Sequence, residues 1–421
     1  MRSITVIAII TVVGMLVAGA AGAQQVRIGL NYPETGPYSV QGLAQLRAAR
    51  MAIDEINASG GIAGRTVTLV VRDTRSEPDR STKNVQELID THGCEMIFGG
   101  SSSAVAIAGG HAARSRGKLY FGTLTYSNST TCEGGHKYIF RECYNAWMGA
   151  RVLSYYLREN YLAGRKYFYI TADYTWGWTT ESSIRKFSNT MNTRRHKSVL
   201  TPFPGADKDD FQKALEEARA AKPDVLVLVL FGQDMVTALS LADAMGLKAE
   251  MEAVVVPNLT LGMAEAAGPK VMAGVIGALP WCWKVPYLHD HEKGQRFVEK
   301  FTERYGGYPS TSAASAYTIL YQYKDAVERA GTFDTRAVIA SLEGHRFTSL
   351  KDQQEWRKFD HQCIQTVYAV RCKPEAEVLK DRYQQDYFEI VNEMSGQEAA
   401  RNQFNWEYER RKANLPVELQ W

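Results

Sequence analysis

The sequence predicts an α/β fold with doubly wound architecture, and three observations carry this prediction. Segments with the pattern of strands alternate with segments with the pattern of helices along most of the chain. The run from Asp224 to Leu230 is continuously apolar, which is typical of a parallel strand buried on both faces. The chain has 421 residues, of which 45% are hydrophobic, so it can bury a large core and divides into two domains.

In the first part of the chain, a strand pattern precedes each helix pattern. We expect strands at 26–30, 66–72, 94–98, 120–122 and 138–141. We expect helices at 42–59, 79–91 and 104–115. Gly60 and Gly61 end the first of these helices.

The same alternation continues after residue 165. We expect strands at 166–171, 224–230 and 252–256. We expect helices at 180–193, 208–221, 235–245, 295–305, 312–330 and 335–343. Strands that alternate with helices in this way form parallel sheets covered by helices on both faces.

Residues 1–23 have the pattern of a signal peptide. Met1-Arg2-Ser3 precede an apolar run from Ile4 to about Val17, and Ala21-Gly22-Ala23 then predict cleavage after Ala23. An uncleaved membrane anchor is the alternative, although the run is near the lower length limit for spanning a bilayer. No lipobox cysteine follows the run, so we expect export to the periplasm and no direct membrane insertion after signal cleavage.

The charge balance argues against a nucleic-acid partner. Lys and Arg number 49 and Asp and Glu number 46, which leaves a formal charge of only +3. No cluster of cations with interleaved aromatics occurs in the sequence, and such a cluster is the usual footprint of nucleic-acid binding.

All six cysteines lie after the signal pattern, and none forms a C-x-x-C pair. Cys132 and Cys143 bracket a short polar loop and a strand, and in an exported protein this spacing predicts a disulfide between them. Cys363 and Cys372 bracket a strand pattern that would hold its ends roughly 25 Å apart. A disulfide needs Cα atoms within about 7 Å, so this second pair requires the strand to turn back. Cys94 and Cys282 are expected to be buried thiols.

No motif in the sequence indicates an enzyme, a cofactor or a metal site. The chain lacks a Walker P-loop, an H-E-x-x-H pair and a G-x-S-x-G elbow. His289, His291 and Glu292 form a short cluster of metal-ligating types, but nothing in the spacing aims them together, so we expect a solvated loop.

Several motifs resemble those of a known family. Val26 to Leu30, then Thr35-Gly36-Pro37-Tyr38, then the run 52–64 (AIDEINASGGIAG) are similar to the opening of type I periplasmic solute-binding proteins of ABC transporters. The branch is the leucine/isoleucine/valine-binding one. Further matches are Asp73, the run 98–104 (FGGSSSA), Asp173 to Gly177, Phe211, Pro223-Asp224 and 305–309 (YGGYP). The resemblance covers roughly residues 25 to 345.

The resemblance implies two doubly wound α/β lobes joined by three crossovers, the type I periplasmic binding protein fold. The N-terminal lobe would comprise 24–143 and 280–346, and the C-terminal lobe 144–279 and 347–393. Residues 394–421 form a tail to which the sequence assigns no structure. The implied function is capture of a small organic solute, an amino acid or a related carboxylate, by a monomer that delivers it to ABC permease subunits. The alternatives are binding of aromatic acids, amides or urea, and a soluble sensory role.

Polar residues that follow strands of the first lobe are candidate ligand contacts. Ser101, Ser102 and Ser103 follow the strand ending at Phe98 and open a helix, where hydroxyls and free N–H groups suit a carboxylate. Helix capping alone is the alternative explanation for one of these serines. Leu124 and Thr125 follow the next strand, where the family supplies a carbonyl and a hydroxyl to a bound amino acid; an ordinary turn is the alternative.

Aromatic residues in strand-to-helix loops are candidate walls of the cleft. They are Tyr38, Tyr174, Trp176 and Phe231, and Gln233 follows the last of them. Simple packing is the alternative for each. Trp281 and Trp283 stand near an expected crossover, where we expect them to pack at the hinge.

One position departs from the family pattern. Amino-acid binders of the branch place an acidic residue after the strand that here reads Val254-Val-Val-Pro-Asn258, and this chain has Asn258 there. Asp173 or Asp234 could substitute for this acid, but neither is at the matching position. Acids that lack an amine, aromatic ones included, therefore rank close behind amino acids as expected ligands.

Overall fold

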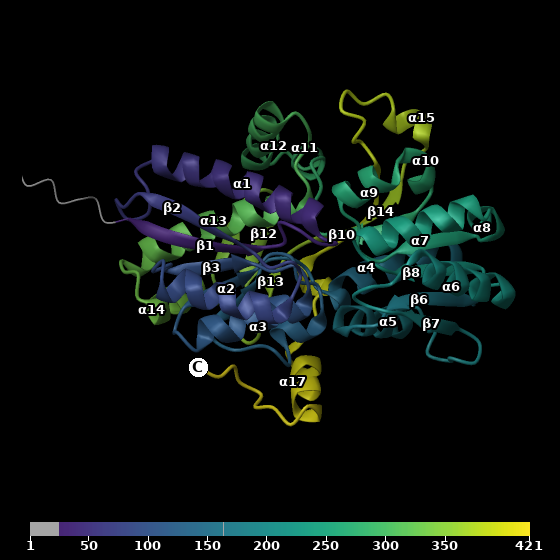
Figure 1. Cartoon of the computed structure of the whole chain (residues 1–421), viewed down its shortest axis with the longest axis horizontal. Helices are drawn as coiled ribbons and strands as arrows, with labels where there is room; N and C mark the ends of the chain where they lie inside the picture. The colour runs from purple at the N-terminus through teal and green to yellow at the C-terminus, as the bar shows by residue number, and fades with distance from the viewer. Residues whose placement is uncertain (1–24, 163) are drawn as a thin grey trace, which may run out of the picture.

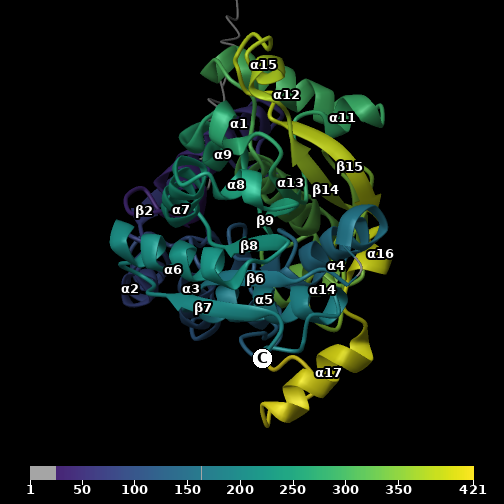
Figure 2. The same cartoon turned by 90° about the vertical axis from the view of Figure 1, so that its right-hand side faces the viewer.

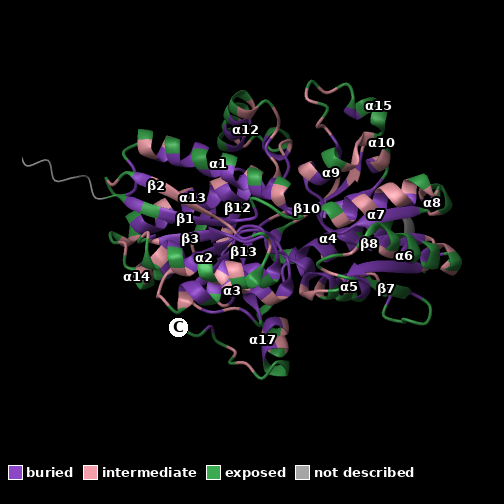
Figure 3. Cartoon of the chain, in the orientation of Figure 1, coloured by how far each residue is buried: buried purple, intermediate pink, exposed green. Residues whose placement is uncertain are grey.

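The computed structural model describes residues 25–162 and 164–421, and the signal peptide expected at 1–23 lies outside the described residues. Two lobes, each with its own sheet, lie side by side and are joined across the middle (Figure 1). Figure 3 shows that buried residues fill the sheets of both lobes and the region where the lobes meet.

The first lobe is built on a parallel five-stranded sheet in the order β2-β1-β3-β4-β5. Its strands are β1 (Val26–Tyr32), β2 (Val67–Asp73), β3 (Met96–Gly99), β4 (Leu119–Gly122) and β5 (Ile139–Arg141). Its helices are α1 (Ser39–Ala58), α2 (Pro78–Asp90), α3 (Ser103–Arg114), η1 (Asn128–Thr131), α11 (Val285–Leu288), α12 (Glu292–Tyr305), α13 (Thr311–Ala330) and α14 (Thr335–Leu342).

Helices cover both faces of this sheet, and its central strand β3 is apolar on both sides. In β3, Met96 and Phe98 join the large core under α1 and α13, while Ile97 joins the core under α2 and α3. This arrangement is the doubly wound one that the alternating pattern predicts.

The second lobe is built on a seven-stranded sheet in the order β15-β14-β10-β9-β8-β6-β7. Its strands are β6 (Tyr167–Ala172), β7 (Lys197–Thr201), β8 (Val225–Val229), β9 (Ala253–Val256), β10 (Ile276–Leu279), β14 (Val367–Cys372) and β15 (Phe388–Met394). Its helices are α4 (Ala146–Leu157), η2 (Arg158–Leu162), α5 (Thr175–Phe187), α6 (Lys208–Ala221), α7 (Gln233–Ala244), α8 (Leu247–Glu250), α9 (Leu261–Ala267), α10 (Pro269–Met272) and α15 (Glu375–Val378). β14 and β15 pair antiparallel at one edge of the otherwise parallel sheet.

The chain passes between the two sheets three times: from β5 to α4, from β10 to α11, and from β13 to β14. A small antiparallel sheet precedes the third crossover and consists of β11 (Arg346–Thr348), β12 (Gln353–Trp356) and β13 (Cys363–Ile364). The segment 363–372, expected as one strand, is split by a turn at Gln365 and Thr366, so β13 and β14 belong to different sheets.

Two short helices, α16 (Gly396–Ala399) and α17 (Gln403–Lys412), follow β15. α16 contacts α4 of the second lobe (Figure 2), whereas α17 packs on the first lobe, where Trp406 donates from its indole N–H to the carbonyl of Thr131 at 2.8 Å. The tail therefore contacts both lobes.

The helix expected at 180–193 is shifted. α5 begins five residues earlier, at Thr175, because its first turn packs directly on the end of β6. A Cβ on Gly177 would lie 2.0 Å from the carbonyl oxygen of Ala172, so only glycine allows this approach. The helix ends at Phe187 and the chain turns before β7.

Candidate functional site

The lobes approach each other most closely where loops at the carboxyl ends of the two sheets meet. Gly232, before α7, lies against Pro37 and Tyr38, so that a Cβ on Gly232 would be 2.7 Å from the carbonyl oxygen of Pro37. Gly262 of α9 lies against Val40 of α1, where a Cβ would be 2.4 Å from the Cγ1 of the valine. Both glycines belong to the second lobe, and both contacts cross the cleft.

An aromatic cluster fills this junction. The ring of Phe231 lies 5.4 Å from that of Tyr38, 5.7 Å from that of Tyr126 and 6.0 Å from that of Trp176. Tyr174 stacks on Phe203 at 3.9 Å. The structure thus brings together all four aromatics that the sequence singles out, and adds Tyr126 and Phe203.

The hydroxyls of Tyr38 and Tyr174 bridge the lobes at 3.4 Å. Asp234, in the first turn of α7, lies near both. Burial raises the pKa of the Asp234 carboxyl to about 6, because no described cation offsets the loss of hydration. Gln233 beside it is exposed, and its amide faces Thr237 of its own helix at 3.4 Å, away from the cluster.

The three serines before α3 are buried, and each has a partner within the protein. Ser102 caps the helix by accepting from the backbone N–H of Val105, and Ser103 accepts from that of Ser127 at 3.1 Å. The hydroxyl of Ser101 lies 3.4 Å from that of Thr74. Capping therefore accounts for Ser102, and no serine side chain is left without a contact.

The loop after β4 is buried as well. The hydroxyl of Thr125 lies 2.6 Å from that of Thr130, and Leu124 is fully covered. Thr123 donates to the side-chain carbonyl of Gln45 on α1 at 2.6 Å, which leaves the amide nitrogen of Gln45 without a partner.

Five buried polar atoms on segments that meet at the junction have no hydrogen-bond partner among the described residues. They are Gln41 Oε1, Gln45 Nε2, Tyr126 OH, Asn258 Nδ2 and Ser312 Oγ. Buried polar groups in proteins are almost always paired, so these five atoms are candidate contacts for a bound group.

Contacts connect four of these five residues to the aromatic cluster or across the cleft beside it. Tyr144 packs edge-on against Tyr126 at 5.6 Å and donates to Asn258 Oδ1 at 2.9 Å. Ser312, in the first turn of α13, faces Tyr126. Gln41 donates across the cleft to Thr260, two residues after Asn258, at 3.3 Å. The atoms therefore surround one junction and come from both lobes.

A second group of polar residues ties the crossovers together, and we name it the crossover cluster: Glu142, Lys351 and Gln365 with the carbonyls of Pro280 and Thr366. The ammonium of Lys351 donates to Pro280 at 2.6 Å and to Thr366 at 2.7 Å, which lie on the second and third crossovers. Glu142, on the first crossover, accepts from Ser315, and Gln365 donates to its backbone carbonyl. Burial raises the pKa of Glu142 and lowers that of Lys351.

With this geometry established, comparison with known proteins identifies the family. The family model described as "Periplasmic binding protein" matches residues 25–377. The chain belongs to this family.

Relatives and solved structures agree with the assignment. The "Leu/Ile/Val-binding protein homolog 4" of Brucella melitensis is 24% identical over 360 residues, which cover 82% of this chain and 84% of the relative. A periplasmic binding protein from Burkholderia mallei superposes with a TM-score of 0.80 at 22% identity, covering 91% of this chain and 98% of that one. A solute binding protein of an R. palustris ABC transporter, in complex with benzoate, superposes with a TM-score of 0.75 at 20% identity. The match covers 88% of this chain and 97% of that one. The type I periplasmic binding protein fold is thereby confirmed.

Sequence reasoning missed five residues of the candidate site in this periplasmic binding protein: Gln41, Gln45, Tyr126, Phe203 and Ser312. Tyr126 and Phe203 follow β4 and β7 at the same sheet edges as the predicted residues, so the rule that found Thr125 and Phe231 extends to them. Gln45 and Ser312 lie on helices far apart in sequence, and no local pattern distinguishes them from other buried polar residues.

The predicted disulfide between Cys132 and Cys143 is wrong, and all six cysteines are free thiols. The two sulfurs lie in different cores. Cys143 Sγ lies 3.2 Å from the carbonyl of Thr125 near the cleft, whereas Cys132 packs with Trp406 of α17. Burial raises the pKa of each thiol to about 12, so both stay protonated at neutral pH.

In the sequence cluster around His289 and His291, the two imidazole rings lie 6.1 Å apart. His289 pairs with Glu393 at 3.1 Å, and no group of three or more His, Cys, Asp or Glu residues gathers as metal ligands in residues 25–162 and 164–421. Within the same ranges, no helix has both the length and the apolar character needed to cross a membrane.

Proposed function

We propose that this periplasmic binding protein captures a small carboxylate with an apolar or aromatic body at the lobe junction and delivers it to an ABC importer. One observation carries the proposal. The unpaired amide nitrogen of Asn258 and the unpaired hydroxyls of Tyr126 and Ser312 lie beside the aromatic cluster, and the unpaired amide nitrogen of Gln45 lies one turn from Gln41 on α1. Amide nitrogens are hydrogen-bond donors, so an oxygen acceptor such as a carboxylate suits them.

The aromatic cluster suits the other end of the solute. Tyr38, Tyr126 and Phe231 lie in tilted contact across the junction and would offer flat faces to an aromatic or branched body. The named relatives bind, by their printed names, Leu/Ile/Val in one case and benzoate in another. Both are carboxylates with apolar bodies.

Whether the site prefers a solute with an amine depends on the acids at the junction. Asn258 is the residue that replaces the acid expected for an ammonium group, and it offers an unpaired donor instead. Asp234 is the acid in reach of the cluster, with a raised pKa that an ammonium would lower again. We therefore rank amino acids first and aromatic acids without an amine close behind.

The test is a thermal-shift screen of amino acids, their deaminated analogues and aromatic acids, followed by calorimetry. The variant Tyr126→Phe removes only the unpaired hydroxyl and should weaken binding about tenfold, since a lost charged hydrogen bond costs about 1.5 kcal/mol or more. Tyr120→Phe is the matched control. Its hydroxyl is also buried without a partner, but its ring belongs to the core under α2 and α3. Stabilisation only by sugars, polyamines or metal ions would refute the proposal.

The partners follow from the same proposal. We expect cleavage after Ala23, a monomeric mature protein, recognition of the closed lobes by permease subunits, and no catalytic turnover. Native mass spectrometry of the protein purified from its own host tests the monomer and the co-purified solute together.

A further inference from the structure

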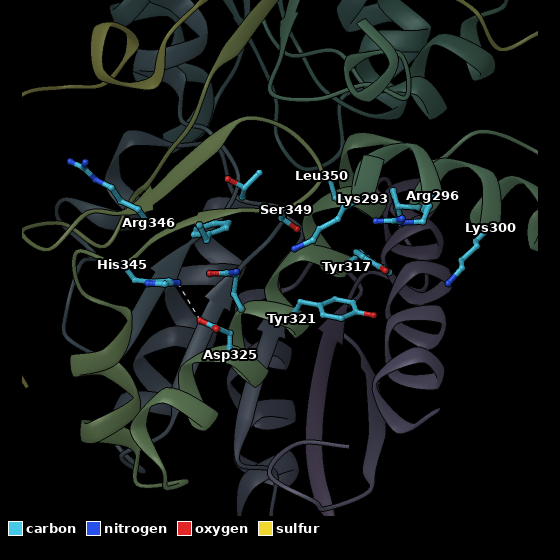
Figure 4. Close-up of a pocket in the computed structure, with 14 residues that line it drawn as sticks. Lys293, Arg296, Lys300, Tyr317, Tyr321, Asp325, His345, Arg346, Ser349 and Leu350 are labelled. Carbon is cyan, nitrogen blue, oxygen red and sulfur yellow. Dashed lines mark ion pairs between the residues drawn. The ribbon is translucent and has the colours of Figure 1, made fainter. Parts of the chain in front are cut away.

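A cavity of about 390 Å³ lies on the first lobe, outside the lobe junction, and we name it the α12–α13 pocket. Helices α12 and α13 form two of its walls, and the segment 345–350 around β11 forms the third (Figure 4). None of its lining residues belongs to the aromatic cluster or to the five unpaired polar atoms of the junction. Its size falls within the range of small-molecule sites.

The deep part of the pocket is apolar and aromatic. Phe297, Phe347 and Leu350 are buried, and the rings of Tyr317 and Tyr321 complete the wall. Both tyrosine hydroxyls donate to the carboxylate of Glu55 on α1, which holds the rings in place. A flat or branched apolar group would therefore find a preformed surface.

The mouth of the pocket is cationic. Lys293, Arg296 and Lys300 lie on α12, and Arg346 lies on β11. Figure 4 shows the ammonium of Lys293 extending over the pocket towards Ser349, and among the described residues Lys293 has no ion-pair partner. Arg296 has only a long contact of 3.6 Å with the exposed Glu292.

The acids at the pocket are already paired. Asp325, the acid among the lining residues, pairs with His345 at 3.2 Å and with Arg329 at 2.7 Å. Glu55 behind the tyrosines pairs with Lys300 at 2.8 Å, which lowers the pKa of that carboxyl and keeps it ionised. Lys293 and Arg296 are therefore the charges left to attract a ligand, and both are positive.

We propose that the α12–α13 pocket is a second binding site, which takes a small organic anion with an apolar body. The carboxylate lies between Lys293 and Arg296 at the mouth, and the apolar body packs on Phe297 and Tyr317. Lys293 and Arg296 are one turn apart on α12, so both cations reach the same oxygen pair.

The floor of the pocket leads to the crossover cluster. The carbonyl of Leu350 lies 3.5 Å from the indole N–H of Trp281, and the next residue, Lys351, holds the second and third crossovers. An occupant of the pocket therefore rests next to Lys351, which holds two crossovers, and this position is separate from the solute at the junction.

The test measures binding of benzoate and of its neutral analogue benzamide to the full chain by calorimetry. In Lys293→Glu, benzoate should bind about tenfold more weakly at one class of site, and benzamide should be unaffected. Lys213→Glu is the matched control, because Lys213 is likewise an exposed lysine on a helix, α6 of the other lobe. Both positions are exposed, and circular dichroism confirms that both variants fold.

The outcome separates the two sites. If benzoate binding weakens in Lys293→Glu and is unchanged in Tyr126→Phe, the result supports a second site in the pocket, whatever binds at the junction. No benzoate binding up to millimolar concentration, or binding that responds only to Tyr126→Phe, overturns the second site. Equal loss in Lys213→Glu also overturns it, because that result indicates attraction by overall charge alone.

Discussion

Replacing Gly262 by alanine should oppose closure of the lobes without weakening either lobe. Gly262 lies in the first turn of α9, where alanine is a better helix former than glycine by up to about 1 kcal/mol. The alanine methyl would lie 2.4 Å from Val40 Cγ1 on α1, and the next atom, Val40 Cβ, is 3.7 Å away. The clash is therefore confined to one side chain of the opposite lobe.

The size of the effect follows from this distance. Carbon atoms pack at about 3.5 to 4.0 Å, so the helices must separate by about 1 Å or Val40 must rotate. Valine in a helix strongly prefers one rotamer, which makes rotation costly. Overpacking of this kind costs about 1 to 3 kcal/mol, and solute affinity should fall about 5- to 150-fold.

The assay is calorimetry with the solute that most stabilises the wild-type protein, combined with thermal unfolding of the free protein. Gly262→Ala should bind more weakly and unfold at the same or a higher temperature. Val40→Ala removes the opposing methyl groups from a half-exposed position, and the double variant should regain most of the lost affinity. Additive losses in the double variant would show that the two residues do not meet in the bound state.

Three further predictions concern buried groups. Burial raises the pKa of Asp234 from 3.8 to about 6, so the folded protein binds a proton that the unfolded chain releases, and stability falls as pH rises from about 4 to 6. In urea unfolding, Asp234→Asn should be more stable than wild type by up to about 3 kcal/mol above pH 6 and equally stable below pH 4. A difference that stays constant across pH would show that titration of Asp234 is not the cause. Lys351→Met removes the donor to two crossovers and isolates Glu142, so we expect a loss of about 3 to 5 kcal/mol in unfolding free energy, partly restored by adding Glu142→Gln. A loss below 1 kcal/mol would show that the crossover cluster does not hold the crossovers. Without reductant, all six cysteines should alkylate after denaturation, and a peptide linking Cys132 to Cys143 would contradict the structure.

The fold could be predicted from the sequence because its signals are local. The strand expected at 26–30 lies within β1, and the apolar run 224–230 contains β8, an interior strand of the second sheet. The tail is different. α17 has a polar, weakly patterned sequence and is held by Trp406 against the distant Thr131, a contact that no local periodicity indicates.

The candidate site could be predicted only in part. Tyr38 and Phe231 lie at strand-to-helix loops, and the loop rule alone places them at the junction. The pairing of Ser102 with its own helix also follows from sequence, since serine is a preferred cap. That Tyr126 and Asn258 both contact Tyr144 depends on how three crossovers set one lobe against the other, which is tertiary information.

At the proposed site, the unpaired polar atoms would couple solute binding to lobe closure. In the closed arrangement, Gln45 Nε2, Tyr126 OH and Asn258 Nδ2 are covered without partners, and each such group costs about 1 to 3 kcal/mol. Three of them together disfavour the closed state without solute by about 3 to 9 kcal/mol. A carboxylate that accepts from these groups removes this cost in the closed state and not in the open one, where water already solvates them. Shifting a two-state equilibrium from 1:99 to 99:1 requires about 5.5 kcal/mol of differential affinity. The cost at the junction, about 3 to 9 kcal/mol, spans that amount. The aromatic contacts between the lobes favour closure whichever carboxylate is bound. Selectivity for the oxygen end of the solute and the closing motion therefore have the same physical origin.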